Sequence, residues 1–402
     1  MRIAVIGGAG GMGRVTTADA AKSEGVELVL LVDRDEGRAA EVAAAHGNVE
    51  VRAPGDGAAG MLAALAGADA VVNAATHRLN VPVMQACLEI GAHYTDLGGL
   101  YYYAIEQYEL DEAFRRAGLS AAISMGAAPG ITNMLAAAAV AELDTVESIE
   151  VLDACVAGRP YDPDEPYVPA YAADTLIDEF TRPAPMFIDG REQLMAAGGG
   201  ARTYHLPEGD VECVYTIHSE PATLPRSYTE LGIRTVEWRL GLPPAHTLPL
   251  RALVASGMAS TEPVRVNGHD VIPRDVLVAV LARQAGAPED PGALERLRAH
   301  VVGTRGGERV EIDADLPLAQ SAEWGTDAGT YSTGVPPSIA AQLLAGGQAL
   351  RTGVGGPEVM LPVAPFFAAL ACSACVTTAS SCAAPSSPSI QSTRSERLPC
   401  RW

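Results

Sequence analysis

The chain has 402 residues, and its 28 Lys and Arg residues face 49 Asp and Glu residues, which gives a formal net charge of −21. Charge of this sign repels phosphate backbones and anionic lipids, so a small molecule is a better expected partner than nucleic acid or a membrane surface. The length predicts two or three folding units. The short apolar run at the N-terminus predicts neither export nor a membrane span, hence a cytoplasmic protein.

The basic residues include a single lysine, Lys22, and all the others are arginine. Any mechanism that needs a catalytic lysine elsewhere in the chain is therefore excluded. This removes short-chain dehydrogenases with a Tyr-x-x-x-Lys pair, enzymes that form Schiff bases on lysine, and nucleotide-binding loops that depend on a lysine.

Residues 1–128 alternate between β-branched runs and helical patterns at the spacing of βαβ units, which predicts a doubly wound, parallel Rossmann sheet. The expected strands cover residues 2–6, 26–32, 49–52, 70–74, 93–96 and 119–124. The expected helices cover residues 13–24, 36–46, 60–66, 81–90 and 105–117. In such a sheet the ligand binds beyond the carboxyl ends of the strands.

Residues 129–330 contain strands that follow one another without a helix at each step, which predicts an α+β substrate and dimerisation domain with a mixed or antiparallel sheet. Its expected elements are helices over 131–141 and 276–285 and strands over 148–155, 211–218, 235–240 and 264–266. Residues 331–370 have helical patterns at 338–344 and 364–370 that we expect to pack back on the Rossmann domain.

Residues 371–402 lack apolar periodicity, so we expect a disordered tail. Cys372 and Cys375 within it have no His or Cys pair at the spacing of a zinc finger, and no metal site is expected.

The glycine-rich turn after the first strand fits the pattern G-x-G-x-x-G. Gly8 is expected to make the tight turn, Gly10 to let the backbone approach a pyrophosphate, and Gly13 to let the helix pack on the strand. The N–H groups at the start of this helix, where Gly11 and Met12 lie, are expected to bind the phosphates. The sequence therefore predicts a dinucleotide cofactor.

Residues after the second and third strands bear on which dinucleotide is bound. Asp33 would accept hydrogen bonds from the adenosine ribose and repel a 2′-phosphate, which favours NAD. Arg34, next to it, could instead stack on adenine or hold the phosphate of NADP. Asp56 is placed to contact the adenine amino group. NAD is the expected cofactor, and NADP stays open.

The carboxyl ends of the fourth and fifth strands should face the nicotinamide. Asn73 and Ala74 are expected to contact the cofactor there, and Asn80 the substrate. His77 and Asp96 are titratable groups whose pKa could be tuned for proton transfer, so both are candidate catalytic residues. Each has a structural alternative: His77 would only cap the following helix, and Asp96 would only anchor the turn after it.

Two further segments carry candidate binding residues. Residues 126–133 form a strand-to-helix turn in which Gly126 and Pro129 are expected to meet the cofactor. Residues 218–226 leave a strand with an imidazole, hydroxyls and a guanidinium, a set that suits an amino-acid carboxylate with Arg226 as the clamp; the alternative is a polar loop. The candidate substrate-binding residues are Asn80, Tyr102, Asn133, His218, Thr223 and Arg226.

Several of these segments together resemble the saccharopine dehydrogenase family, and within it members similar to lysine 6-dehydrogenase. The Asp-Leu-Gly-Gly, Ala-Pro-Gly and Pro-Arg-Asp-Val-Leu motifs, in this order, are more specific than the nucleotide turn. The resemblance is carried by the glycine-rich turn, residues 69–75, 94–99, 128–133, 218–225, 266–277 and 334–336. It implies a Rossmann domain and a mixed-sheet domain that covers the cleft, often in a homodimer.

The resemblance also implies chemistry at a C–N bond without a metal. In lysine 6-dehydrogenase-like enzymes, NAD takes a hydride from the carbon that bears the side-chain amine and water hydrolyses the imine, so the expected function is oxidative deamination of lysine or a related diamine. In one alternative, a saccharopine-type reductase uses NADP to form a secondary amine. In another, of a different class, a Rossmann protein senses a nucleotide without turnover.

Overall fold

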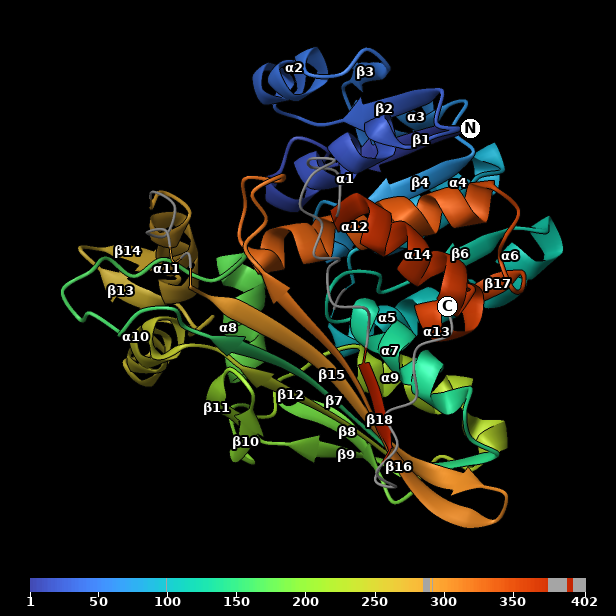
Figure 1. Cartoon of the computed structure of the whole chain (residues 1–402). Helices are drawn as coiled ribbons and strands as arrows, with labels where there is room; N and C mark the ends of the chain where they lie inside the picture. Colours follow the sequence, from blue (N-terminus) through green and yellow to red (C-terminus); the bar gives the residue numbers. More distant parts are fainter. Residues whose placement is uncertain (99, 285–289, 291, 375–388, 393–402) are drawn as a thin grey trace.

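The computed structural model of the chain describes residues 1–98, 100–284, 290, 292–374 and 389–392. Two sheets dominate it: a parallel sheet of mainly N-terminal strands and a mixed sheet of mainly central strands, drawn above and below each other in Figure 1. The predicted combination of a Rossmann sheet with a second, mixed sheet is confirmed.

Seven parallel strands form the first sheet in the order β17-β6-β5-β4-β1-β2-β3. They are β1 (Arg2–Ile6), β2 (Leu28–Val32), β3 (Val49–Arg52), β4 (Ala70–Asn73), β5 (His93–Asp96), β6 (Ser120–Ala122) and β17 (Gly353–Gly355). The central strands β1, β2 and β4 are apolar runs that are buried on both faces. The strand order reverses between β1 and β4, where a doubly wound sheet binds its ligand.

The helices of this domain connect successive parallel strands. They are α1 (Gly11–Lys22), α2 (Glu36–Ala44), α3 (Gly57–Leu65), η1 (His77–Leu79), α4 (Asn80–Ile90), α5 (Tyr101–Tyr108) and α6 (Asp111–Ala117). Most boundaries agree with the sequence pattern to within a few residues. Strand β17 was not expected, because its three residues near the C-terminus carry no strand pattern of their own.

The second sheet has the order β18-β16-β15-β7-β12-β8-β9, and all pairs except β7 with β12 are antiparallel. Its strands are β7 (Thr145–Val156), β8 (Ala184–Ile188), β9 (Arg191–Met195), β12 (Thr235–Gly241), β15 (Leu294–Arg305), β16 (Glu308–Ala319) and β18 (Ser389–Ser392). Two small hairpins accompany it, β10 (Arg202–Leu206) with β11 (Gly209–Cys213), and β13 (Val264–Val266) with β14 (His269–Val271).

The remaining helices cover the inner face of this sheet, form a lobe at its edge, or return to the first domain (Figure 1). They are α7 (Ile131–Val140), α8 (Ala173–Thr181), α9 (Glu220–Ser227), η2 (Thr229–Leu231), α10 (Pro244–Ala255), α11 (Pro273–Leu281), α12 (Ala328–Ala345), α13 (Pro357–Met360) and α14 (Val363–Ala374). No helix in the described ranges is both long enough and apolar enough to cross a membrane.

Helix α12 packs on α1, β4 and β5, and so joins the C-terminal part of the chain to the nucleotide-binding half. The helices touch at Gly334, where an added Cβ would lie 2.7 Å from the Val15 Cβ and 2.8 Å from the Met12 carbonyl oxygen. The Thr16 hydroxyl donates to the Gly334 carbonyl over 2.7 Å. Close packing at one glycine therefore sets the separation of the two helices.

Further features differ from the sequence expectation. The long hairpin of β15 and β16 was not expected, although its alternation of charged and apolar residues and the Gly306-Gly307 pair between its strands are typical of a hairpin. Residues 220–227 form helix α9 and not a polar loop, in spite of two prolines. Helix α14 continues to Ala374 and residues 389–392 pair with β16, so the expected disorder is wrong for these pieces of residues 371–402; the rest of that tail, with Cys375, lies outside the described residues.

Candidate active site

The glycine-rich turn between β1 and α1 has the shape of a dinucleotide cradle. A Cβ at Gly13 would lie 2.0 Å from the Gly7 carbonyl oxygen, so the helix packs directly on the turn. Gly7 has a left-handed backbone, with φ at +72°. At Gly8, by contrast, Leu31 and Thr17 leave no room for a side chain. The backbone at Gly11 faces open space. Open backbone at a helix N-terminus fits a pyrophosphate.

Asp33 braces this turn from the end of β2. One of its carboxylate oxygens accepts from the Ala9 N–H and the other from the Asp35 N–H, each over 3.0 Å. A shallow depression beside it is lined by Asp33, Arg34, Asp35, Glu36 and Arg38. Arg34 and Arg38 lie at this depression with three carboxylates, and Arg38 forms an ion pair with Asp35 over 3.3 Å. A guanidinium here is suited to an additional phosphate, and a carboxylate already held by backbone N–H groups has less capacity for ribose hydroxyls.

A buried chain of amides and one carboxylate connects the ends of β4 and β5. Asn73 donates to the Asn80 side chain over 2.7 Å, Asn80 donates to Gln107 over 3.3 Å, and Gln107 donates to Asp96 over 2.6 Å. The other Asp96 oxygen accepts from the N–H groups of Gly98 and Ser124 over 2.8 and 2.9 Å. Burial raises the pKa of Asp96. Its hydrogen bonds favour the anchoring role over proton transfer.

His77 lies in η1, just beyond β4. Its ring packs on Tyr103 with 4.2 Å between centroids, and its buried Nε2 atom has no hydrogen-bond partner among the described residues. Burial, and then the neighbouring Arg78, lower the pKa of His77, so its imidazole is neutral at pH 7. The Thr76 side chain caps η1, so His77 does not have the capping role. A neutral imidazole with a free nitrogen stays a candidate for proton transfer.

The turn after β6 is packed against the turn after β5. A Cβ at Gly98 would lie 2.6 Å from the Pro129 Cγ, and the Gly126 N–H donates to the Pro129 carbonyl over 2.6 Å.

Asn133, fully buried, donates to Thr223 and Glu358 over 3.0 and 2.9 Å. The polar atoms of Asn133 and Thr223 thus connect helices α7, α9 and α13 and are not directed at a substrate.

His218 is the sequence candidate with the most distinctive surroundings. It is 8% exposed, and its ring stacks on Trp238 with centroids 3.9 Å apart and planes 7° apart. Its Nδ1 atom meets the buried Glu220 carboxylate, whose other oxygen accepts from Thr132 over 3.1 Å. Burial by itself lowers the pKa of His218, but Glu220 and nearby carboxylates outweigh burial, so the net pKa is raised. The imidazole is therefore oriented and poised to hold a proton.

Three carboxyl groups share this inner face of the second sheet. Asp153 and Cys155 are two residues apart on β7, so their side chains project from the same face of the sheet. Glu295 on β15 is paired with Cys155 and therefore projects from that face as well. Glu179 on α8 accepts from the Tyr171 hydroxyl. Burial raises the pKa of Glu179 to about 7 and raises the pKa of Asp153 and of Glu295.

These carboxyl groups have no cationic partner of their own. Within the described ranges, no Arg or Lys forms an ion pair with Asp153, Glu179 or Glu295, and His218 is the basic group whose charge acts on Asp153 and Glu179. Glu179 and Glu295 are buried, whereas Asp153 keeps some exposed surface. Unpaired buried carboxyl groups are costly, so the cluster is suited to a cationic ligand.

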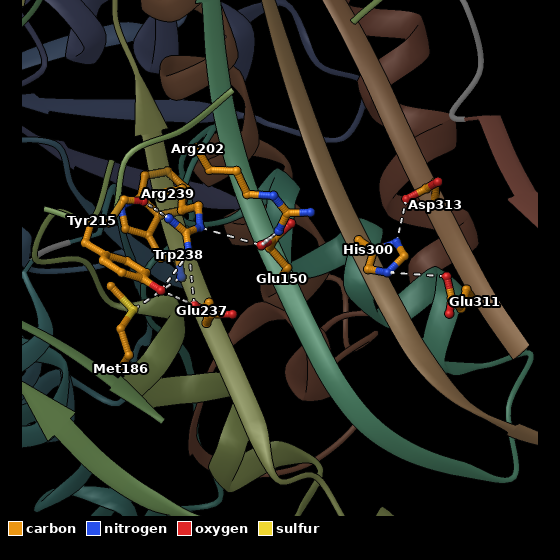
Figure 2. Close-up of polar contacts among 11 residues, drawn as sticks. Glu150, Met186, Arg202, Tyr215, Glu237, Trp238, Arg239, His300, Glu311 and Asp313 are labelled. Atoms are coloured by element: carbon orange, nitrogen blue, oxygen red, sulfur yellow. Dashed lines mark hydrogen bonds and ion pairs between the residues drawn. The ribbon is translucent and has the colours of Figure 1, made fainter. Parts of the chain in front are cut away.

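The outer face of the same sheet provides a contrast, because its charges are paired (Figure 2). Arg202 binds Glu150 over 2.8 Å, and Arg239, stacked on Tyr215, lies 3.6 Å from the same carboxylate. His300 binds Asp313 over 2.8 Å. The unpaired acids are therefore a property of the inner face.

The inner face meets the Rossmann sheet at its carboxyl end. The Ser219 hydroxyl, next to His218, donates to the Ser124 hydroxyl over 3.1 Å, and the Ser124 N–H donates to Asp96. His218 therefore lies one residue from the contact between the two domains, on the side where the nicotinamide of a Rossmann enzyme is expected.

Other predicted residues lie elsewhere. Arg226, in the last turn of α9, is exposed and stacks on Tyr108 with its guanidinium 4.9 Å from the ring centre, so the structure does not bring it to His218. Tyr102 is 37% exposed and lies 5.4 Å from the Arg182 guanidinium. Asp56 is exposed at the start of α3, and Ala74 donates to the Ile6 carbonyl over 2.9 Å.

Sequence reasoning missed Asp153, Glu179, Glu295 and Tyr171. Two signals could have found them: Asp153 interrupts the apolar pattern of a buried strand, and Glu179 lies between Ile177 and Phe180 on the inward face of an amphipathic helix. Lys22, at the end of α1, places its ammonium 4.6 Å from the ring centre of Trp324.

Two family models match the chain: the saccharopine dehydrogenase NADP binding domain over residues 3–122 and the saccharopine dehydrogenase C-terminal domain over residues 126–372. The protein belongs to the saccharopine dehydrogenase family. It is an oxidoreductase that uses NAD or NADP and acts on a C–N bond, as the family resemblance implied.

The chain is similar to named relatives over most of its length. Carboxyaminopropylagmatine dehydrogenase from Synechocystis sp. is 26% identical over 383 residues, which cover 91% of this chain and 94% of that protein. Carboxynorspermidine synthase from Vibrio cholerae serotype O1 is 25% identical over 311 residues, which cover 73% of each. Among solved structures, apo saccharopine dehydrogenase (L-Glu forming) from Saccharomyces cerevisiae matches with a TM-score of 0.69 at 16% identity, covering 92% of this chain and 96% of its own, which shows the shared fold.

Proposed function

We propose that this protein interconverts a secondary amine and its imine, where the amine joins a diamine or polyamine to a carboxylate-bearing fragment, with NADP as the hydride carrier. The observation that carries the proposal is the cluster of Asp153, Glu179 and Glu295 beside His218, in which Glu179 and Glu295 are buried. Such a cluster favours a substrate with several cationic nitrogens. The names of the two relatives, which denote carboxylated polyamines, point to the same substrate class.

The reaction needs a base before hydride transfer, because a protonated amine cannot release hydride from its carbon. In the oxidising direction the ammonium loses a proton to His218, and Glu220 stabilises the imidazolium that forms. The bound nicotinamide cofactor would supply the acceptor for the hydride that leaves the carbon of the reacting C–N bond. The C=N bond that results adds water, and its cleavage yields a carbonyl compound and a primary ammonium. Synthesis of the secondary amine is the reverse.

The cofactor fits the residues present. The open backbone at Gly11 would receive its pyrophosphate at the start of α1. Arg34 would hold a 2′-phosphate at the depression beside Asp33, next to Arg38, which is ion-paired with Asp35 over 3.3 Å. His77, with its free nitrogen, would face the nicotinamide end from β4.

The test is a substrate panel followed by absorbance at 340 nm, with NAD and NADP in parallel. The panel contains carboxynorspermidine and saccharopine as secondary amines, and lysine and ornithine as primary amines. Reduction of NADP with the carboxylated polyamine, and little with lysine, supports the proposal. Oxidation of lysine or ornithine would instead assign the side-chain deamination expected from the sequence. Silence across the panel, with cofactor binding measured by calorimetry, would favour a nucleotide sensor.

We further propose that the protein is a cytoplasmic homodimer that associates through the lobe of α10, β13, β14 and α11. Large apolar side chains that are 36–50% exposed gather on this lobe, namely Leu248, Val264, Val266, Ile272, Val276 and Val280. Light scattering should give twice the chain mass, and the double substitution Val276→Glu with Val280→Glu should give monomers. Leu194→Glu, at an exposed leucine on β9, is the matched control and should leave the dimer intact.

A further inference from the structure

Arg274 lies in the Pro-Arg-Asp-Val-Leu segment that carries part of the family resemblance, and it binds helix α8. Its Nε and one terminal nitrogen donate to the same Asp174 oxygen over 3.1 and 2.6 Å, and that nitrogen also donates to the Asp174 carbonyl over 3.0 Å. Its other terminal nitrogen donates to Asp178 over 2.6 Å. The Arg274 side chain is 13% exposed. Such a multidentate, largely buried contact restrains both residues of α8.

The second carboxylate oxygen of Asp174 forms a hydrogen bond across the domain boundary. It accepts from Arg78 of η1 over 3.2 Å, and Arg78 follows His77 directly in the Rossmann domain. One carboxylate therefore connects α11, α8 and the turn that carries His77. The Arg78 side chain is 65% exposed, so this link by itself contributes little energy, whereas the Arg274–Asp178 pair, with side chains 13% and 12% exposed, is largely protected from water.

Helix α8 carries Glu179 on an adjoining face. Asp174 and Asp178 are four residues apart and form one stripe of the helix, and Glu179 is displaced from that stripe by one residue, or about 100°. The hydrogen bonds of Arg274 to Asp174 and Asp178 therefore fix the rotation of α8 about its axis, and with it the direction of Glu179. The groups that face Glu179 are Tyr171, His218, Asp153 and Glu220.

We propose that Arg274 is a positioning residue: by holding Asp174 and Asp178 it orients α8 so that Glu179 faces His218 and the amine, and through Arg78 it sets this orientation relative to the Rossmann domain. The role rests on the proposed function, because the direction of Glu179 matters for turnover only if the site handles a cationic amine. The chemistry requires Arg at residue 274, since a lysine is a point charge and cannot bind two carboxylates in a fixed geometry.

The test compares Arg274→Met with Arg274→Lys in the full chain. Arg265→Met is the matched control, because Arg265 forms an exposed ion pair with Asp270, at 3.1 Å, in the same lobe without contacting α8. We expect Arg274→Met to lower kcat by roughly 10-fold or more, with the KM for NADPH within about twofold, and Arg274→Lys to recover part of the loss. The pH profile of kcat/KM should change in Arg274→Met, because hydration of Glu179 lowers its pKa and so alters the charge that faces His218.

Hydrogen exchange of the amides of α8 separates a failure of this proposal from a failure of the proposed function, because it needs no substrate. Faster exchange in α8 in Arg274→Met, with unchanged exchange in Arg265→Met, supports the positioning role even if no amine on the panel is turned over. Unchanged exchange in Arg274→Met overturns it. So does an active wild-type enzyme whose kcat and pH profile are the same in Arg274→Met, or an equal loss in Arg265→Met.

Discussion

His218 is the residue whose surroundings best match a group that moves protons. Glu220 fixes its Nδ1 atom and Trp238 fixes its ring plane, which leaves Nε2 as the nitrogen for a substrate. We expect His218→Asn to lower kcat at least about 100-fold, the lower end of what a general base contributes, with NADPH affinity within about twofold. Turnover kinetics and a fluorescence titration with NADPH measure the two. A near-normal rate would contradict this role and favour His77.

Asp96 shows how burial changes the interpretation of a candidate. Both carboxylate oxygens of Asp96 accept hydrogen bonds. In Asp96→Asn one of them is replaced by an NH2 donor, which must face either the Gln107 amide or the N–H groups of Gly98 and Ser124. We expect Asp96→Asn to lower the free energy of unfolding by about 1–3 kcal/mol, measured by urea denaturation. Unchanged stability together with lost turnover would return Asp96 to a catalytic role.

Arg34 is the residue that separates the two nicotinamide cofactors. It lines the depression beside Asp33 and can reach a 2′-phosphate, which NAD lacks. We expect Arg34→Ala to raise the KM for NADP by roughly 10-fold or more and to leave the KM for NAD within about twofold, as measured by steady-state kinetics. An equal change for both cofactors, or no change for either, would exclude Arg34 from phosphate recognition.

At the scale of elements, the contact of α12 with α1 couples the C-terminal half of the chain to the nucleotide turn. In Gly334→Ala the new methyl group would overlap Val15 and the Met12 carbonyl, and Met12 lies in the first turn of α1. We expect a loss of about 1–3 kcal/mol in the free energy of unfolding together with weaker cofactor binding. Thermal denaturation and calorimetry measure these effects. Gly347→Ala, at a left-handed residue beyond α12, is a control that should affect stability alone.

Elements differed in how far the sequence predicted them. The strands β1, β2 and β4 were predictable because they are short apolar runs bounded by helical patterns. Helix α9 was not, because Pro221 and Pro225 suggest a loop, whereas Pro221 lies in the first turn and burial of Ala222 and Leu224 stabilises the helix. Burial between two domains is a tertiary effect that local pattern does not record.

At the scale of the whole molecule, the acid cluster between the domains makes stability depend on pH. Burial raises the pKa of Glu179 to about 7 from an ordinary value of 4.5, so the folded chain holds a proton that the unfolded chain has released. The contribution of Glu179 to the free energy of unfolding is fully present below about pH 4 and is lost as the pH rises through 7. The loss amounts to about 3 kcal/mol at most.

Glu179→Gln tests this dependence, because the amide can still accept from the Tyr171 hydroxyl but carries no charge. We expect the variant to be more stable than the wild type at pH 8.5 and no more stable at pH 4.5, as measured by urea denaturation at each pH. Equal effects at the two pH values would contradict the raised pKa. Spermidine, as a cationic probe, should raise the Tm of the wild type more at pH 8.5 than at pH 5.

The sequence by itself determined the Rossmann half, the dinucleotide turn and the family, because these depend on local periodicity and on glycines at fixed spacing along the chain. It also identified His218, as a polar residue at the end of a strand. Only the tertiary structure decided that the side chains of Asp96, Asn133 and Thr223 form hydrogen bonds within the protein. It also decided that Asp153, Glu179 and Glu295 meet around His218. The physical reason is that burial and the absence of a counter-charge arise from segments 26 to 142 residues apart in the chain, which come together only when β7 and β15 pair in the second sheet and α8 packs beside them.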